Sequence, residues 1–535
     1  MTPLLGRSVA RGALRKAGSA RPYLLGLALY ALLVAAYVGL RFGWRWLDGD
    51  AALLTTAAQN TYVEGTLVPT VGAYYLGYGY ATLNTFLAQV GGVPIEALQV
   101  YVQGFLLVLL VPVSYAAFRA LLGDAATAAL ACPLLFLQPD FLFEALRSSH
   151  AKFTWLLALT MLFVLARSFE VAGSGRALAP RVTMFYLLAY GLITSNFFFA
   201  SSYIFALGFA FLGGWVLARW RRRGLDAEEN LRRLLYVALA CSILVFLFVF
   251  YLYPPSLWMA SFFKSALDRV SGFLLDVETG YNPYLYVQTT WVNPALYLVL
   301  SSLSWLVLGL SFANWAHKAW ALLGRRETLP PGQFLLWLLY TGFALLLALG
   351  VFLDRAGALS ANLQVRLFPH LMIVAIPLAA EMVSRIVARA WRRGKGARLL
   401  AVAVLAAGGL FFSGASIFKA TNEPLLSNRW VFHSRAERAA IEWAGPRHAT
   451  NRVWLGIDDR LRMLPRLYGD WPRSGLEVYT GRQAGNRYDL LLSDLMEKHA
   501  ARLGVLLPEV RGRLLVYDNG GAALYHARAK TPYQR

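Results

Sequence analysis

Two aspartates separated by one glycine, Asp48 and Asp50, follow closely on the first apolar segment of the chain. Carboxylates at this spacing can take a proton from an attacking hydroxyl group or share a divalent cation through their oxygens. The structural alternative is a turn that caps a helix, because Asp50 precedes the helix-like segment 51–60 and aspartate is a favoured N-cap residue. The spacing therefore predicts either a general base or a helix cap.

A second group of ionisable residues lies between two later apolar segments and comprises Glu144, Arg147, His150 and Lys152. Placing ionisable side chains at the face of a membrane costs free energy, so such residues indicate a functional site by default. The three basic residues suit a phosphate better than a metal ion, because each donates charge-assisted hydrogen bonds. The alternative is that the long side chains only extend to the membrane surface.

A third candidate group lies near the start of the late apolar segment 367–386, where Arg366 and His370 occur. Arg366 is the first choice for a phosphate ligand and His370 the weaker one, with a helix-end anchor as the structural alternative for Arg366. The seven histidines show no metal-ligand spacing, and the two cysteines lie inside apolar segments, where they resemble small buried hydrophobic residues.

The elements that must position these residues are membrane-spanning helices. Of the 535 residues, 58% are hydrophobic and only 15% are charged, which is typical of a membrane protein. Apolar segments of the length needed to cross about 30 Å of hydrocarbon lie at 23–40, 97–118, 125–143, 153–169, 182–199, 201–218, 234–253, 295–314, 333–353, 367–386 and 399–418. We therefore predict about eleven spans, of which the first is an uncleaved helix rather than a signal peptide.

The basic residues alternate between the loops, which predicts the orientation of the chain. Basic residues are concentrated before segment 23–40 and in the loops at 167–181, 219–233, 318–326 and 385–398. The positive-inside rule then places the N-terminus in the cytoplasm and the C-terminus outside it. The formal charge of +22 is explained by these loops, so it does not indicate nucleic acid as a partner.

Residues 420–535 have the composition of a soluble α/β domain, whereas 1–419 form the transmembrane domain. Ser434 and Glu437 have capping-box spacing and predict a helix to about Ala444. The segments 452–457 and 488–492 read as strands and 495–503 as a helix, and 513–526 reads as a hairpin on an Asn-Gly turn. The two long outer loops, 41–96 and 254–293, are rich in aromatic residues and are expected to lie along the membrane surface.

The first outer loop resembles that of GT-C-fold glycosyltransferases, the family of protein mannosyltransferases, aminoarabinose transferases and oligosaccharyltransferase catalytic subunits. The likeness rests on the acid pair, the following helix, the turn 64–69 (Glu-Gly-Thr-Leu-Val-Pro) and the stretch 77–80 (Gly-Tyr-Gly-Tyr), and it extends to the layout of the whole chain. The resemblance implies that Asp50, with Asp48 as the alternative, is the catalytic base or an acid that binds the acceptor. His150 and Lys152 stand where some members of the family carry metal-binding acids, so a divalent cation is not required by the sequence.

The sequence thus predicts a polytopic α-helical membrane protein with a small C-terminal α/β domain. By resemblance it is an inverting hexosyl- or pentosyltransferase of the bacterial cytoplasmic membrane. The partners implied are a polyprenyl-phosphate-linked sugar as donor, a lipid, glycan or protein acceptor, and membrane lipids. Arg147, His150, Lys152, Arg366 and His370 would bind the donor phosphate, with Glu144 as a further acid of the site. The alternatives are a polysaccharide polymerase or ligase of the outer leaflet and a non-enzymatic transporter of lipid-linked glycans.

Overall fold

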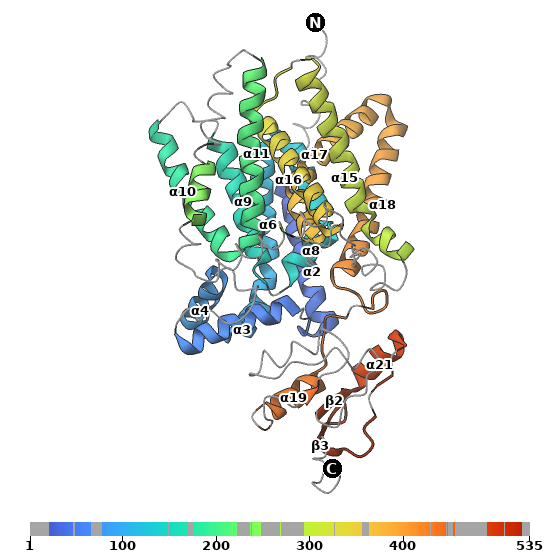
Figure 1. Ribbon diagram of the computed structural model, residues 1–535. Coiled ribbons are helices and arrows are strands. Elements are labelled where there is room, and N and C mark those ends of the chain that lie inside the picture. The colour runs from blue at the N-terminus through green and yellow to red at the C-terminus, as the bar shows by residue number, and fades with distance from the viewer. Residues whose placement is uncertain are drawn as a thin grey trace.

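The computed structural model describes residues 21–46, 49–65, 78–147, 149–168, 175–221, 236, 238–247, 268, 294–325, 327–355, 363–428, 430–445, 447, 453–454, 489–504, 506–507 and 509–526. Most of these residues belong to a bundle of long apolar helices (Figure 1). The bundle helices are α2 (Arg21–Phe42), α6 (Leu106–Leu122), α7 (Ala125–Phe136), α8 (Pro139–Leu146), α9 (Ala151–Ser168), α10 (Gly175–Ser195), α11 (Phe197–Arg221), α15 (Pro294–Leu323), α16 (Pro331–Arg355), α17 (Leu363–Arg393) and α18 (Lys395–Ala420).

The bundle confirms the predicted polytopic membrane protein. Among the described residues, 8 helices are long and apolar enough to cross a membrane, or up to 9 if the bent pair α7–α8 forms one span. The two remaining predicted spans correspond to α10 and to a shorter apolar helix, Ala238–Leu247. The predicted division of the segment 182–218 is correct, because α10 ends at Ser195 and α11 begins at Phe197.

The predicted span 125–143 is wrong as a single straight helix, because α7 and α8 meet at an angle of 70°. Pro139, the first residue of α8, supplies no backbone N–H, and the residue before it, Gln138, has an extended backbone, as proline favours. The predicted span 97–118 also begins too early. Residues 95–105 form α5 (Ile95–Ala97), a π-helical turn (Leu98–Val102) and a 3-10 turn (Gln103–Phe105), and the helix that could span the membrane begins at Gln103.

The irregular segment 95–105 belongs to a layer of short helices at one end of the bundle, which we call the α3 end. The layer contains α3 (Gly49–Glu64) and α4 (Gly79–Gly91), and both lie across the ends of the spans (Figure 1). Buried side-chain amides fix the layer: Gln99 accepts a hydrogen bond from Thr55, and Gln103 Nε2 donates to Asn84 Oδ1 over 2.5 Å. Through these two glutamines, the irregular segment 95–105 is joined to α3 and α4 by buried hydrogen bonds.

The C-terminal α/β region lies at the α3 end (Figure 1). Its sheet has the order β1-β2-β4-β3, with β1 parallel to β2 and the other pairs antiparallel. The elements are β1 (Val453–Trp454), β2 (Asp489–Ser493), β3 (Leu514–Asp518), β4 (Ala522–His526), α19 (Arg435–Ala444) and α21 (Asp494–Leu503). The capping box of Ser434 and Glu437 is present. The predicted hairpin is present as well, with a three-residue connection, 519–521, in which Gly520 has a φ of 80°. The boundary at 419/420 stays a prediction.

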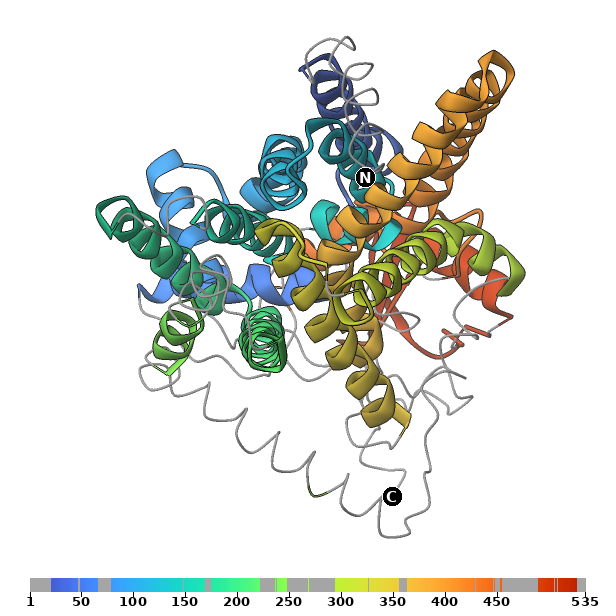
Figure 2. The same cartoon turned by 90° about the horizontal axis from the view of Figure 1, so that it is seen from above.

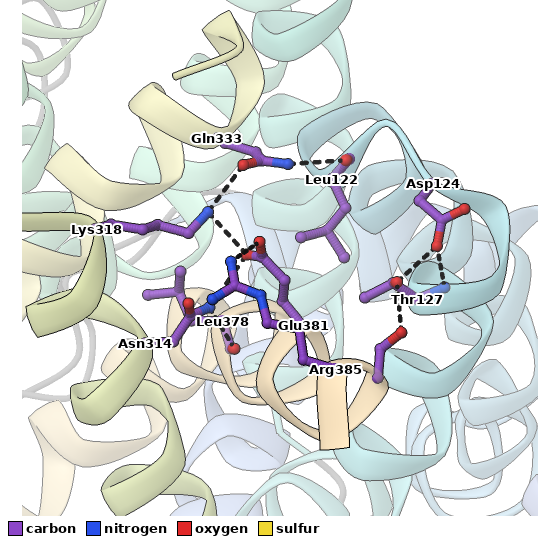
Figure 3. A network of polar contacts seen from close by, with 10 residues as sticks. Leu122, Asp124, Thr127, Asn314, Lys318, Gln333, Leu378, Glu381 and Arg385 are labelled. Atoms are coloured by element: carbon purple, nitrogen blue, oxygen red, sulfur yellow. Dashed lines mark hydrogen bonds and ion pairs between the residues drawn. The ribbon is translucent and has the colours of Figure 1, made fainter. Parts of the chain in front are cut away.

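At the opposite end of the bundle, α15 extends beyond its predicted limit and contributes a buried cation. Lys318, expected in a loop, lies in the helix and forms an ion pair of 2.7 Å with Glu381 of α17. Gln333 of α16 and Asn314 of α15 complete this network (Figure 3). Seen along the bundle, the connected ends of α17 and α18 project beyond the other helices (Figure 2). Most of the apolar side chains of α18 are exposed, as expected for a helix that faces lipid.

Candidate active site

The acid motif follows a sharp turn at the end of α2. Gly43 and Trp44 both have positive φ angles, 59° and 61°, so the chain leaves the helix through two consecutive left-handed residues. This conformation is uncommon for a tryptophan and is held in place by packing. The Trp44 indole lies against Tyr101 and Phe105, and it occupies the space that a Cβ at Gly39 would need.

Asp50 lies in the first turn of α3, which begins at Gly49. Only the backbone of Asp50 is described, and Asp48 lies outside the described residues. Asp50 is therefore inside the helix rather than the capping residue before it, and a negative charge in the first turn is favoured by the helix dipole. The roles of the two acids stay predictions.

Arg147 ends α8 and is held by Glu144 of the same helix. Its Nη2 donates to both carboxylate oxygens, over 2.8 and 2.7 Å, and the guanidinium lies 5.1 Å from the centre of the Phe143 ring. The two contacts fix the orientation of Arg147 at the edge of the bundle. Glu144 also offsets part of its charge, so the pair is less cationic than the sequence suggests.

Phe143 connects Arg147 to the segment that leads into the acid motif. The Trp46 ring meets the Phe143 ring edge-on at a centroid distance of 5.8 Å, and Trp46 is buried. Thus Phe143 contacts both the residue two positions before Asp48 and the guanidinium of Arg147. The structure thus brings Arg147 close to the segment that precedes the acid motif.

His150 and Lys152 lie where α9 begins. The His150 ring meets the ring of Tyr80, in the first turn of α4, at 6.1 Å, and Lys152 is only 1% exposed in the first turn of α9. The His150 carbonyl accepts the Thr154 hydroxyl, which in turn accepts Asn196 Nδ2 over 3.2 Å. Side chains of the first outer loop and of the Arg147–Lys152 loop are therefore in contact.

The Gly-Tyr-Gly-Tyr stretch contacts the end of α10. The hydroxyl groups of Tyr78 and Tyr190 lie 2.6 Å apart, and a Cβ at Gly79 would lie 2.5 Å from Thr194 Oγ1. A glycine at position 79 is what allows α4 to approach α10 so closely. The stretch is thus a packing element as well as part of the family resemblance.

Arg366 and His370 lie on α17. Among the described residues, no defined contact joins them to Arg147, His150 or Lys152. Arg366 is exposed in the first turn of the helix. His370 is buried: its ring stacks edge-on with Phe199 at 4.4 Å, and its Nδ1 lies 3.1 Å from Ser202 Oγ. Asp354, which the sequence analysis left without a role, accepts the backbone N–H groups of Leu363 and Gln364 and so fixes the start of α17.

Sequence analysis missed several residues that surround the acid motif. Trp46 Nε1 donates to the Thr421 carbonyl over 3.0 Å, and Phe432 pairs with Trp46 in an isolated β-bridge. Burial and the nearby Arg435 lower the pKa of Arg45 from its usual value. No local pattern could have found these contacts, because the partners are separated by several hundred residues. Within the described residues, no three His, Cys, Asp or Glu side chains gather as a metal site would require.

Solved structures with a similar fold align with nearly the whole chain. The oligosaccharyltransferase of Archaeoglobus fulgidus, solved with a tethered acceptor peptide containing the NVT sequon, aligns with 95% of this chain and 74% of its own, at 12% identity and a TM-score of 0.57. Its complex with Zn and sulfate aligns with 94% of this chain and 73% of its own, at 13% identity and a TM-score of 0.55. No family model and no curated protein sequence matches the chain.

The fold and the placement of the site therefore define a multi-pass membrane protein with a layer of short helices and an α/β region at one end. More specifically, the chain has the GT-C fold of membrane glycosyltransferases. At this level of identity the likeness concerns the fold. The activity and the roles of Asp48, Asp50 and the basic residues are argued below.

Proposed function

We propose that the chain is an inverting glycosyltransferase that moves a sugar from a polyprenyl-phosphate donor to an acceptor hydroxyl group. The observation that carries the proposal is the position of the motif Asp48-Gly49-Asp50 within a GT-C fold: it runs directly into α3, in the helical layer that covers one end of the bundle. The basic residues Arg147, His150 and Lys152 lie on the loop that contacts the same layer through Trp46 and Tyr80.

The α3 end is proposed to face away from the cytoplasm, in a bacterial cytoplasmic membrane. The opposite end carries Lys318 and Arg385, and also the basic last turn of α17 and the basic first turn of α18. Basic residues concentrate on the cytoplasmic side of membrane proteins. This orientation supports a lipid-linked donor, because such a donor can be presented in the outer leaflet without a soluble nucleotide sugar.

In the proposed reaction, the Asp50 carboxylate accepts the proton of the acceptor hydroxyl as its oxygen attacks the anomeric carbon. The new C–O bond forms on the face opposite the phosphate, and the electron pair of the breaking bond leaves with the phosphate oxygen. One displacement of this kind inverts the anomeric configuration. Asp48 is the alternative base.

The basic residues would stabilise the negative charge that collects on the departing phosphate. Arg147 is oriented by its two hydrogen bonds to Glu144, and Lys152 lies buried in the first turn of α9. Arg366, at the exposed start of α17, would contribute as well, and His370 lies one helical turn further along the same helix.

The proposal is tested by replacing the two acids and measuring transfer in membranes from undecaprenyl-phosphate mannose and undecaprenyl-phosphate arabinose as probe donors. We expect Asp50→Asn to lower the transfer rate by about 10²–10⁴-fold, the range for loss of a general base. Asp124→Asn is the matched control, because Asp124 caps α7 at the opposite end of the bundle and asparagine caps equally well. Transfer that is unchanged in both Asp50→Asn and Asp48→Asn would remove the catalytic assignment.

A further inference from the structure

We propose that residues 421–428 and 430–433, which lie between α18 and α19, act as a clamp that positions the acid motif, so that the C-terminal region is a working part of the active site. We call these residues the clamp segment. The inference rests on the proposed function, since it assigns positioning residues for the base Asp50 or Asp48. It follows from contacts on both sides of the motif.

Before the motif, the clamp segment binds the backbone and the side chain of the residues that lead into it. Trp46 and Phe432 form an antiparallel β-bridge, and His433 N donates to the Arg45 carbonyl over 3.2 Å. The Trp46 indole N–H donates to the Thr421 carbonyl over 3.0 Å, so both ends of the clamp segment hold Trp46 and its neighbour. Trp46 is therefore fixed in position and in orientation.

The clamp segment is itself anchored to α2 by a buried acid. The Glu423 side chain is 3% exposed and accepts hydrogen bonds from Arg41 Nη2 over 2.6 Å and from the Tyr37 hydroxyl over 3.0 Å. Phe42 and Phe432 add a ring contact at 5.3 Å. A carboxylate with two donors at this depth gives a well-defined register between the clamp segment and α2.

After the motif, the chain enters the apolar core of the C-terminal region. Ala51, next to Asp50, is fully buried and packs in a cluster with residues of α19, β2, α21 and β4. Arg438 of α19 also forms an ion pair with Glu96 over 3.2 Å. The acids at 48 and 50 thus lie between two points, Trp46 and Ala51, that both depend on the C-terminal region.

A general base acts only when its oxygen lies within hydrogen-bond reach of the proton it accepts, and an error of about 1 Å in such a position can lower a rate about 10²-fold. Loosening the clamp is therefore expected to lower kcat, whereas the KM for the donor, which is set by the lipid and phosphate contacts, changes little. A variant that only reduced the amount of folded protein would lower the apparent maximal rate in proportion to that amount.

A reversible cross-link tests the clamp directly in the full chain. The hydrogen bond between His433 and Arg45 flanks the pair Trp46–Phe432, which is therefore a non-hydrogen-bonded antiparallel pair with a Cα separation of about 4.5 Å. A disulfide accepts Cα separations of about 4.4–6.8 Å. In the double variant Trp46→Cys/Phe432→Cys, we expect transfer to fall about 10–100-fold when the thiols are reduced and to recover at least half of that loss when they are oxidised. The two single variants show no such dependence on redox state.

Hydrogen–deuterium exchange supplies a readout that does not depend on transfer. In Glu423→Gln, backbone amides of residues 43–56 are expected to exchange at least tenfold faster than in the wild type. In the control Glu442→Gln, which alters an exposed ion pair of α19, they exchange at the wild-type rate. Unchanged exchange in Glu423→Gln, or transfer that is equal in the reduced and oxidised double variant, overturns the clamp. A third outcome separates the two proposals. If Glu423→Gln exchanges faster but the wild type transfers neither probe sugar, the clamp is supported and the proposed function is not.

Discussion

The buried ion pair of Lys318 and Glu381 allows a quantitative test of what holds the bundle together at the end opposite the site. Glu381 accepts bonds from Lys318 Nζ and Arg385 Nη2, each 2.7 Å long, and from Asn314 Nδ2 over 3.1 Å. Lys318 is 2% exposed and has Gln333 Oε1 as a further acceptor at 3.0 Å. The perturbations are the two single neutral replacements and their combination (Figure 3).

The geometry predicts unequal losses. Glu381→Gln leaves the Lys318 ammonium buried without its counter-charge, and a buried charge left in this way costs about 3–5 kcal/mol of stability. Lys318→Met leaves Glu381 with Arg385 and Asn314 as donors, so the loss is that of one charged hydrogen bond, about 1.5–3 kcal/mol. The double variant Lys318→Met/Glu381→Gln removes both charges and is expected to be more stable than Glu381→Gln alone, because no buried ammonium group is left without its counter-charge.

The assay is reversible unfolding by SDS titration in mixed micelles, with the free energy of unfolding compared across the double-mutant cycle. Transfer measured well below the unfolding range serves as the control and should be unchanged in all three variants, since the network lies far from α3. Equal losses in the two single variants would refute the reasoning. A double variant no more stable than Glu381→Gln would refute it as well.

Three further predictions concern single contacts. Gly79→Ala places a methyl group 2.5 Å from Thr194 Oγ1 and is expected to cost about 1–3 kcal/mol by overpacking; Gly79→Ala/Thr194→Ala, measured by the same SDS titration, recovers part of the loss. Asp354→Leu removes the acceptor of the N–H groups at the start of α17 and is expected to cost about 1–3 kcal/mol, whereas Asp354→Asn costs less. Ser493→Ala removes the cap of α21 and is expected to cost about 1 kcal/mol, seen as faster amide exchange in residues 494–497.

The sequence was informative wherever structure depends on neighbours along the chain. Each predicted span contains a helix in the described residues, because a continuous apolar run of that length has few alternatives in a membrane. The same holds for α19, whose capping box involves residues three apart, and for the hairpin of β3 and β4, whose turn residues are adjacent. The bend at Pro139 was missed, because an apolar composition alone does not separate one span from two short helices.

The arrangement of the site could not be predicted in the same way. Tyr37 and Glu423 are 386 residues apart, and Trp46 and Thr421 are 375 apart, so no periodicity or motif relates them. The extended α15 was missed for another reason: Lys318 looks like a loop residue until Glu381 is known to face it. Charge patterns identify loops only when the charge has no partner within the bundle.

The bend between α7 and α8 connects the bundle to the clamp segment. Pro139 has no N–H, and the bend that it introduces leaves the Leu137 carbonyl accepting a hydrogen bond from Ser416 of α18. Lys419, in the last turn of α18, lies 3.5 Å from Asp140 of α8 and over the Tyr297 ring. Because apolar packing gives little specificity between helices in lipid, these polar contacts determine where the largely exposed α18 ends. The clamp segment begins directly after α18, at Thr421. The position of Trp46, and with it the position of the acid motif, therefore depends on the bend between α7 and α8, although this bend lies far from the motif in the sequence.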